Sequence, residues 1–289
     1  MKAKKYCFNG ENKLKLDKIS TDSKADKVSK ETILKKTLGN QEKIAALQEK
    51  LYADGREGVI LVLQAIDAAG KDSTVKHVMS GINPQGVDVV SFKQPNSEEL
   101  SHDFLWRVNK HLPQRGKIGI FNRSYYEDVL VVQVHKINHT YHMASRIVDM
   151  DDDKFFEKRY AHIRNYEEYL YDNSYRIVKF FLNVSKEEQK ERFLERIDNP
   201  DKNWKFDEGD LKERALWDDY HKVFEDVINA TATKECPWYV LPVDQKWYTR
   251  YLVSEILLKT LEDIDPKYPD FPDEKKAVLA ECRKSLMEE

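Results

Sequence analysis

The residues with the clearest chemical potential lie in the stretch AIDAAGKDST, from Ala65 to Thr74. A Gly-Lys pair between an apolar run and the start of a helix is typical of loops that bind phosphate. Backbone N–H groups of small residues, the helix N-terminus and the lysine all contact phosphate oxygens in such loops. We therefore predict phosphate contacts from the following residues: Ala68, Ala69, Gly70, Lys71, Asp72, Ser73 and, one turn later, Lys76. The alternative, an ordinary turn with a solvated lysine, is disfavoured by the strand–turn–helix context.

This loop departs from the common pattern at two positions. Ala65 stands where the first glycine is usual, and Asp72 follows Lys71 where a metal-binding hydroxyl is usual. A magnesium ion must therefore find oxygen ligands elsewhere, and Asp67 can supply one. Asp72 is either a more distant partner of the metal or an acid favoured by the helix dipole. We prefer the second interpretation, because extra negative charge beside bound phosphates is costly.

A second candidate stretch, IGIFNRSYYEDVLVV, follows a short apolar run and begins at Ile118. Many phosphoryl transferases hold a metal with an aspartate at this strand end, where this chain has Asn122, whose carbonyl can bind a metal or orient a water. Arg123 has the forked geometry that suits phosphate. Glu127 lies four residues on, so a surface ion pair with Arg123 is the alternative. Beside a phosphate loop we favour the functional interpretation.

A third candidate is the helix that follows Ser185. Arg192 and Arg196 are four residues apart and so project from one helix face, and Lys202 and Lys205 follow in a broken loop. In nucleotide kinases a mobile segment at this place closes arginines over the transferring phosphoryl group. A solvated helix with a Glu188–Arg192 pair explains the same residues, and the sequence leaves the two interpretations open. We take residues 185–215 as the lid.

Composition limits the remaining possibilities. The chain has 289 residues and a net charge of −3, so any anion site depends on local arrangement, and we expect no nucleic-acid partner. No apolar run approaches a membrane span. The three cysteines fit neither a disulfide framework nor a zinc site and suit the cytoplasm. We assign three histidines to a polar loop rather than a metal site: His135, His139 and His142. Three basic residues are expected to extend an anion channel: Lys76, Arg115 and Lys117.

These segments must be positioned by alternating strands and helices. After an arm at 1–28 and a helix at 29–52, apolar runs predict strands at 59–66, 87–92, 118–121, 175–184 and 238–243. Helices are predicted at 70–80, 97–112, 125–134, 152–171 and 247–263, with a short one at the end of the chain. Capping boxes of Ser185 with Glu188 and of Asp210 with Glu213 open two more, the second reaching about 229.

This order predicts an α/β fold with a five-stranded parallel sheet and helices on both faces. Ligands of such sheets bind outside the carboxyl ends of the strands. That rule selects the junctions after Ile66, Phe121 and Val184, where the three candidate stretches lie.

Taken together, four stretches resemble the polyphosphate kinase 2 family over residues 30–262. They are IDAAGKDSTVKHVMSGINPQGV, IGIFNRSYYEDVLVVQVH, FFLNVSKEEQKERFLERIDNPDKNWK and CPWYVLPVDQKWYTRYLVSEIL. Asn122 with Glu127 is similar to the class III subgroup, which is associated with phosphorylating AMP and ADP from inorganic polyphosphate. The resemblance implies a three-layer P-loop kinase domain at 29–289 with a helical lid, Mg²⁺ (Mn²⁺ can substitute), and a homodimer or homotetramer. It also implies functional roles for Asp67, Lys71, Asn122, Arg123, Glu127, Asp128, Arg192 and Arg196.

The predicted reaction is reversible transfer of the terminal phosphoryl group of polyphosphate to AMP and/or ADP. We expect Asp67, Lys71, Arg123, Glu127 and Arg192 to be catalytic, with Asp67 and Glu127 also holding the metal. Two alternatives are an ATP-dependent nucleotide kinase on the same fold and a non-catalytic module that binds nucleotide or polyphosphate. A guanine-nucleotide switch is disfavoured because the chain has no N-K-x-D sequence.

Overall fold

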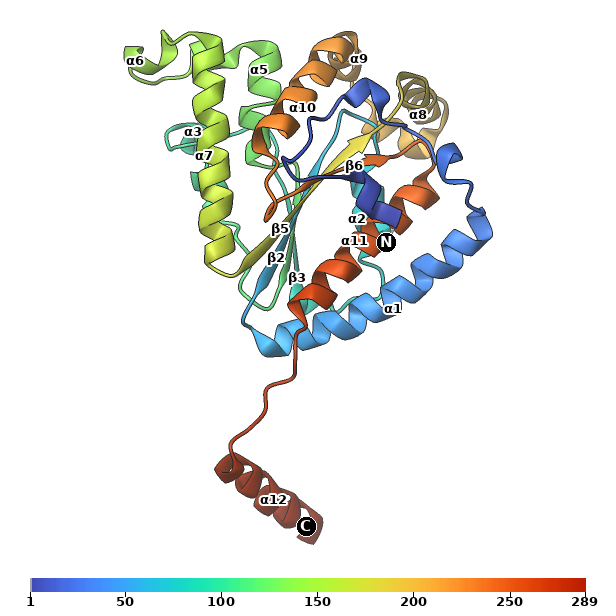
Figure 1. The fold of residues 1–289 in the computed structure, drawn as a ribbon, viewed down its shortest axis with the longest axis vertical. Coiled ribbons are helices and arrows are strands. Elements are labelled where there is room, and N and C mark those ends of the chain that lie inside the picture. The colour runs from blue at the N-terminus through green and yellow to red at the C-terminus, as the bar shows by residue number, and fades with distance from the viewer. Residues whose placement is uncertain (1) are drawn as a thin grey trace.

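A computed structural model describes residues 2–289, in which a six-stranded sheet forms the centre of the molecule (Figure 1). The order across the sheet is β1-β6-β5-β2-β4-β3. The strands are β1 (Cys7–Phe8), β2 (Gly58–Gln64), β3 (Val87–Ser91), β4 (Ile118–Asn122), β5 (Tyr175–Asn183) and β6 (Trp238–Pro242). The five predicted strands are confirmed and run parallel. The sixth, β1, pairs antiparallel with β6; two residues are too short for a sequence pattern to reveal.

Helices cover both faces of the sheet, which explains why β2 is buried along its whole length. One group contains α1 (Lys30–Asp54), α2 (Lys71–Val78) and α11 (Lys246–Ile264), which pack against one another. The other contains α5 (Val131–His135), α7 (Asp152–Asp172) and α10 (Trp217–Thr231). Figure 1 shows the two groups on opposite sides of the strands. The predicted three-layer α/β architecture is therefore confirmed.

The arm before α1 packs onto the body of the protein. It contains short 3₁₀ turns, η1 (Lys2–Tyr6), η2 (Leu16–Lys18) and η3 (Lys24–Asp26), besides β1. Ala3, Tyr6, Leu14 and Leu16 are buried. The Asp26 carboxylate accepts hydrogen bonds from the Tyr6 hydroxyl at 2.6 Å and the Tyr248 hydroxyl at 2.5 Å, which fixes the arm against α11.

Two predicted helices are interrupted. The segment 97–112 forms two single turns, α3 (Ser97–Leu100) and α4 (Trp106–Asn109). The Ser101 hydroxyl bonds back to the Glu98 carbonyl, and the Asp103 carboxylate accepts the Leu105 N–H, so side chains compete with helical bonds between the turns. The segment 125–134 likewise divides into η5 (Tyr125–Asp128) and α5.

The two predicted capping boxes have different outcomes. The Ser185 hydroxyl does accept the Glu188 N–H at 3.1 Å and opens α8 (Lys186–Asp198), but Glu188 pairs with Arg192 instead of returning to Ser185. The second box is wrong. Asp210 lies inside α9 (Gly209–Ala215), which a short turn separates from α10, and Asp207 accepts the Gly209 N–H. The remaining turns are η4 (Pro84–Gly86), η6 (Ile137–Thr140), α6 (Ser145–Val148) and η7 (Pro200–Lys205).

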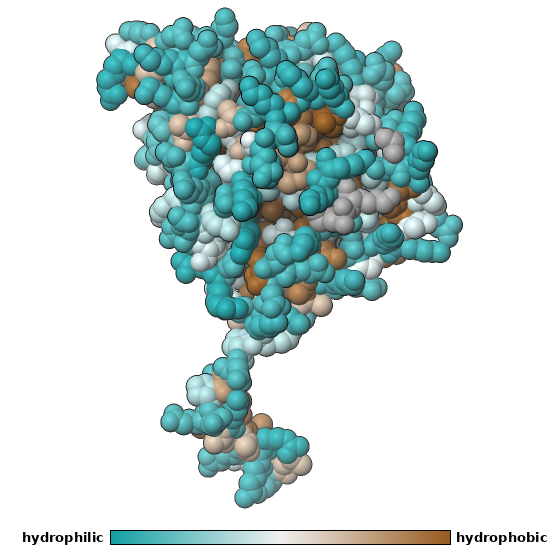
Figure 2. All heavy atoms as spheres, viewed as in Figure 1, coloured by the Kyte–Doolittle hydropathy of each residue, from teal (hydrophilic) through white to brown (hydrophobic). Residues whose placement is uncertain are grey.

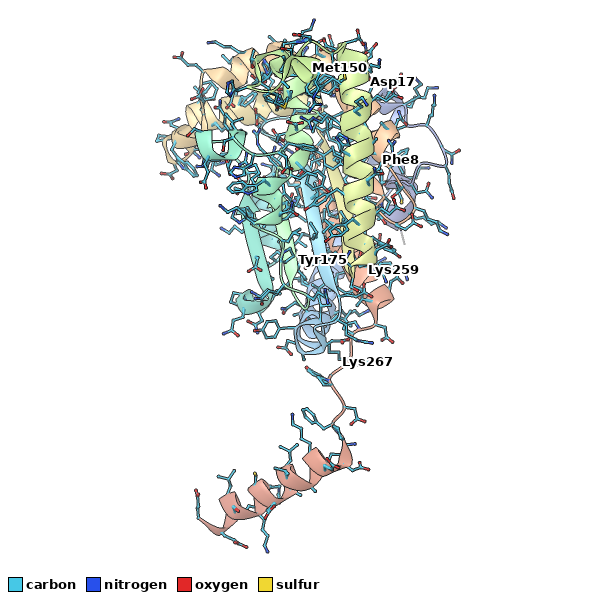
Figure 3. The ribbon with its side chains drawn as sticks, turned by 90° about the vertical axis from the view of Figure 1, so that its left-hand side faces the viewer. Phe8, Asp17, Met150, Tyr175, Lys259 and Lys267 are labelled. Carbon is cyan, nitrogen blue, oxygen red and sulfur yellow. The ribbon has the colours of Figure 1, made fainter. Side chains whose placement is uncertain are left out.

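The C-terminal helix α12 (Asp273–Glu288) stands away from the body. Figure 3, seen from the side, shows the chain leaving the body near Lys267. Polar side chains cover most of the face seen in Figure 2, the tail included. Within residues 2–289, no helix is long and apolar enough to cross a membrane.

Candidate active site

The phosphate loop connects the carboxyl end of β2 to the first turn of α2. Its backbone adopts left-handed angles at Ala68 (φ 60°) and Gly70 (φ 98°), which glycine adopts without strain. The Lys71 ammonium turns back and donates to the Ala65 carbonyl at 3.0 Å. Burial and, to a smaller extent, the nearby Arg123 lower the pKa of Lys71 to about 8, against the opposing charges of Asp67, Glu127 and Asp72.

Arg123 joins the ends of two neighbouring strands. Its N–H donates to the Leu63 carbonyl at 3.0 Å, and its backbone takes the left-handed angle φ 65°. Its guanidinium donates to Asp67 Oδ1 at 2.9 Å and to Glu127 Oε2 at 3.1 Å. The side chains of Asp67, Glu127 and Arg123 are 28%, 27% and 38% exposed, so solvent and ligands can reach them. The structure therefore brings the predicted residues of the first two stretches together.

Two residues that differ from the usual pattern of phosphoryl transferases, Asp72 after Lys71 and Asn122 at the end of β4, contact each other directly. The Asn122 amide donates to Asp72 Oδ1 at 2.6 Å. Asp72 also lies in the first turn of α2, where the helix dipole favours an acid. An amide at the end of β4 and an acid after Lys71 thus form one hydrogen-bonded pair. An aspartate in place of Asn122 would have no N–H group to donate to Asp72, and the two carboxylates would repel each other.

Side chains of helix α8 donate hydrogen bonds to the backbone carbonyls of the phosphate loop. The Arg192 side chain is only 6% exposed, and it donates to the carbonyls of Ala68 (3.0 Å), Ala69 (2.8 Å) and Val243 (2.5 Å). Gln189, which the sequence analysis missed, donates to the Asp67 carbonyl at 2.9 Å. Arg192 is thus held against the backbone of the loop, whereas a lid arginine would close over the transferring phosphoryl group. Its catalytic role stays a prediction, and its contacts are those of a positioning residue.

Other predicted residues lie outside this cluster. Arg196 donates to Asp210 at 3.2 Å and to the Lys205 carbonyl at 3.1 Å, within the predicted lid. Lys76 is exposed on the second turn of α2. Asp128 pairs with Arg159 at 2.9 Å and accepts the Tyr141 hydroxyl at 2.6 Å. Burial raises the pKa of Asp128 to about 6, against the opposing effect of Arg159.

The predicted basic channel is wrong at two positions. Arg115 and Lys117 precede β4, so they lie at the amino ends of the parallel strands, and Lys117 pairs with Asp88 at 3.4 Å. Five strand residues separate that edge from Arg123 by about 16 Å. In the histidine segment, His135 pairs with Glu213 at 3.0 Å and His139 with Asp152 at 2.8 Å.

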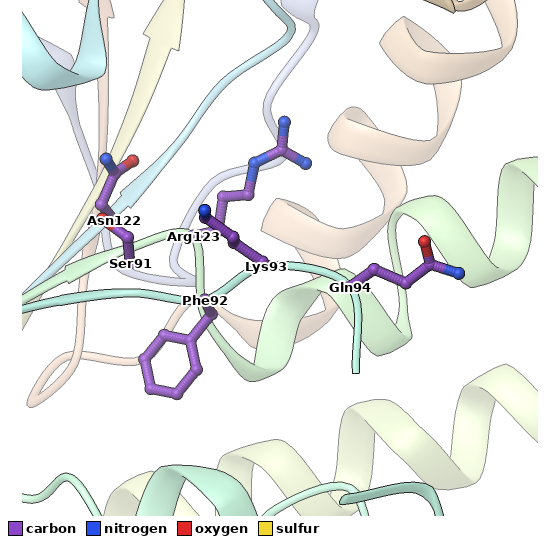
Figure 4. A pocket seen from close by; sticks show the side chains of 6 residues that line it. All are labelled: Ser91, Phe92, Lys93, Gln94, Asn122 and Arg123. Atoms are coloured by element: carbon purple, nitrogen blue, oxygen red, sulfur yellow. The ribbon is translucent and has the colours of Figure 1, made fainter. Parts of the chain in front are cut away.

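A cavity of about 310 Å³ opens beside the cluster at the carboxyl ends of β3 and β4 (Figure 4). Its lining consists of Ser91, Phe92, Lys93, Gln94, Asn122 and Arg123. Lys93 and Gln94 are exposed and follow β3 directly. These two residues were not predicted from the sequence, although their position directly after a parallel strand is a signal that could have indicated them.

Comparisons with known proteins agree with this geometry. The family model described as Polyphosphate kinase 2 (PPK2) matches residues 27–269, a range that includes the loop, Arg123 and α8. The chain belongs to the polyphosphate kinase 2 family. The arm before residue 27 and the tail after residue 269 lie outside the matched region.

Individual relatives match most of the chain. An "ADP-polyphosphate phosphotransferase" of Rhodopseudomonas palustris is 47% identical, covering 85% of this chain and 85% of the relative. An "AMP/ADP-polyphosphate phosphotransferase" of Meiothermus ruber is 43% identical, covering 92% and 95%. The crystal structure of polyphosphate kinase 2 from Arthrobacter aurescens TC1 superposes with a TM-score of 0.84, at 36% identity and 96% coverage of both chains.

Proposed function

We propose that this polyphosphate kinase 2 family member transfers the terminal phosphoryl group of inorganic polyphosphate to AMP and/or ADP, giving ADP and ATP. The names of the two relatives describe this kind of transfer. The observation that carries the proposal is the meeting of Lys71, Arg123 and two partly exposed carboxylates at the carboxyl ends of β2 and β4. One phosphoanhydride breaks and another forms, so the reaction is nearly balanced and reversible.

The chain's own residues act mainly by positioning and by neutralising charge. The attacking oxygen belongs to a phosphate group that is already ionised at neutral pH, so no strong general base is needed. The obstacle is the repulsion between two polyanions. Lys71, Arg123 and the loop N–H groups bind the phosphoryl oxygens and hold donor and acceptor in line. Gln189 and Arg192, on helix α8, hold the loop carbonyls in place by hydrogen bonds.

The donor set fits a magnesium ion. Asp67 and Glu127 present carboxylate oxygens on either side of one guanidinium and are each about a quarter exposed. Magnesium in kinases is bound by one or two carboxylates, with substrate phosphates and water completing its shell. We propose Asp67 and Glu127 as its protein ligands, with Mn²⁺ as a substitute. The ion would supply further charge neutralisation on the phosphates.

The cavity beside Arg123 is the proposed place of the acceptor nucleotide. It shares Asn122 and Arg123 with the phosphate cluster, so an acceptor phosphate there would lie next to the donor. Lys93 lines the same cavity and can pair with that phosphate.

An assay without ATP tests this function. AMP, Mg²⁺ and polyphosphate are supplied as the only substrates, and ADP and ATP are measured over time. Formation of ADP and ATP supports the proposal, whereas an ATP-dependent nucleotide kinase would form neither. A non-catalytic module would bind both substrates without turnover.

We also propose a homodimer or homotetramer in the cytoplasm. Leu34 and Leu38 lie four residues apart on α1 and are 43% and 61% exposed, which suits a helix face covered by another subunit. Three free thiols suit a reducing compartment. Light scattering of the purified protein measures the mass directly, and a monomer at micromolar concentration would refute the assembly.

A further inference from the structure

Among the contacts of the N-terminal arm with the body, which include the pairing of β1 with β6, two pairs of hydrogen bonds lie at separate places. At the first, Asn229 of α10 accepts the Leu14 N–H at 2.7 Å and donates to the Leu14 carbonyl at 3.1 Å. At the second, the Thr21 hydroxyl donates to Asp244 Oδ2 at 2.7 Å, and the Asp244 N–H donates to the Thr21 carbonyl at 2.9 Å. The second attachment lies at the corner between β6 and α11.

Asp244 connects this corner to the helix under the phosphate loop. Its other carboxylate oxygen, Oδ1, accepts the N–H of Ser185 at 2.9 Å. Ser185 caps α8, so one carboxylate joins the arm to the first turn of that helix. The carbonyl of Val243, the preceding residue, accepts from Arg192 at 2.5 Å. Helix α8 is therefore held at this corner through Ser185 and Arg192, which lie about two helical turns apart.

Helix α8 in turn sets the orientation of the loop backbone. Gln189 and Arg192 donate to the carbonyls of Asp67 and Ala69. In a planar trans peptide the C=O and N–H bonds point in opposite directions. Fixing these two carbonyls toward α8 therefore turns the N–H groups of Ala68 and Gly70 away from it, toward the side where a phosphate would be held.

We infer that Thr21 is a positioning residue for the phosphate loop, acting through Asp244, the capped start of α8, and the carbonyls of the loop. The inference rests on the proposed function only in that the ligand is a chain of phosphates. Thr21 itself touches no substrate. The arm lies outside the region that the family model matches, so this support is added to the shared domain from outside it.

The decisive experiment compares Thr21→Val with Thr21→Ser in the full chain. Two constants are measured: the Kd for tripolyphosphate, by calorimetry, and the KM for polyphosphate. Valine keeps the shape of threonine and removes one hydrogen bond to a carboxylate, so we expect both constants to rise about fivefold. The kcat should change less than twofold, because the loop contacts phosphate in the ground state and the transition state alike. Serine, which keeps the hydroxyl, should restore both constants.

Asn229→Ala is the matched control, since it loosens the arm at its other attachment. It should lower the melting temperature as Thr21→Val does, yet leave tripolyphosphate affinity within twofold of the wild type. A double-mutant cycle with Asp244→Ala adds a second test: Thr21→Val should have no further effect once Asp244 is gone.

Equal tripolyphosphate affinity for the wild type and Thr21→Val would overturn the inference, as would an equal loss in Asn229→Ala. Failure of the wild type to bind tripolyphosphate would overturn it too. Binding needs no turnover, so a wild type that binds tripolyphosphate but never forms ADP from AMP would refute the proposed function alone. The affinity of Thr21→Val would still decide the role of the arm.

Discussion

Two charged clusters of this protein adjoin in the segment from Arg123 to Glu127 and differ in how far solvent can reach them. The open cluster is the site of Asp67, Lys71, Arg123 and Glu127. The closed cluster is built around Lys179 and Glu167, which are 0% and 1% exposed and pair at 2.5 Å. Tyr125 and Tyr126 belong to the closed cluster, although they follow Arg123 by only two and three residues.

In the closed cluster every donor has a partner. The Lys179 ammonium donates to Glu167, to the Tyr126 hydroxyl at 3.1 Å and to the Thr231 carbonyl at 2.9 Å. Glu167 Oε1 accepts both tyrosine hydroxyls, at 2.7 and 2.8 Å. Burial and the Glu167 charge raise the pKa of both tyrosines well above the usual value, so both stay neutral donors. Such a network has no capacity left for a ligand.

The open cluster holds opposite charges that are still reachable from solvent. Arg123 is 38% exposed while it contacts two carboxylates, and among residues 2–289 the Lys71 ammonium donates only to the Ala65 carbonyl. Because these ion pairs are partly exposed, phosphate and metal can reach the charged groups. The closed cluster, through Tyr125 and Tyr126, anchors the turn η5 that carries Glu127. The closed cluster therefore holds η5 in place, whereas the open cluster is the one that we propose binds the substrates.

The largest expected effect is in the open cluster. Lys71→Ala removes the charge that we propose contacts the transferring phosphates, so phosphoryl transfer should fall about a thousandfold. The folded state should survive, because a lysine whose pKa is lowered by burial is a cost to folding. Activity and thermal unfolding are measured together, with the exposed Lys43→Ala as control. Near-normal activity would show that the loop is not the phosphate site.

In the closed cluster the same kind of change should act on stability. Lys179→Met leaves the Glu167 charge buried without its partner, which should cost about 3–5 kcal/mol of unfolding free energy in urea titrations. Adding Glu167→Gln should recover part of that loss, since the orphan charge is then gone. Equal stability of Lys179→Met and the wild type would contradict the structural role that we assign to the closed cluster.

The sequence predicted the open cluster and missed the closed one for a physical reason. The phosphate loop is a local pattern, and parallel strands bring Asn122 and Arg123 to the same edge. The Lys179–Glu167 pair, in contrast, joins a strand to a helix, and nothing in either segment marks the two residues as partners. The support of the loop by Arg192 and the link through Asp244 depend on tertiary packing in the same way. Lys117 was misplaced although its position before a strand indicated the opposite edge.

The open cluster should also respond to pH through Lys71. The pKa of Lys71 is lowered to about 8, so in the free protein the charge is lost as pH rises through that value. The KM for polyphosphate should therefore rise about fivefold between pH 8 and pH 9, as the protonated fraction falls. Because the unfolded state binds its proton more tightly, stability should increase between pH 8 and the ordinary lysine value. In Lys71→Arg the KM should not depend on pH in this range.

The smallest effect concerns Asp128, which follows Glu127 directly but pairs with Arg159 and Tyr141, outside the open cluster. Its pKa is raised to about 6 by burial, so the folded state binds that proton more tightly than the unfolded state does. This contribution to stability is present at low pH and is lost as pH rises through 6. The wild type should therefore lose about 1 kcal/mol more than Asp128→Asn between pH 5 and pH 7 in urea titrations. Phosphoryl transfer should change little in Asp128→Asn and strongly in Glu127→Gln. An equal fall in both variants would place Asp128 in the open cluster, as the sequence alone predicted.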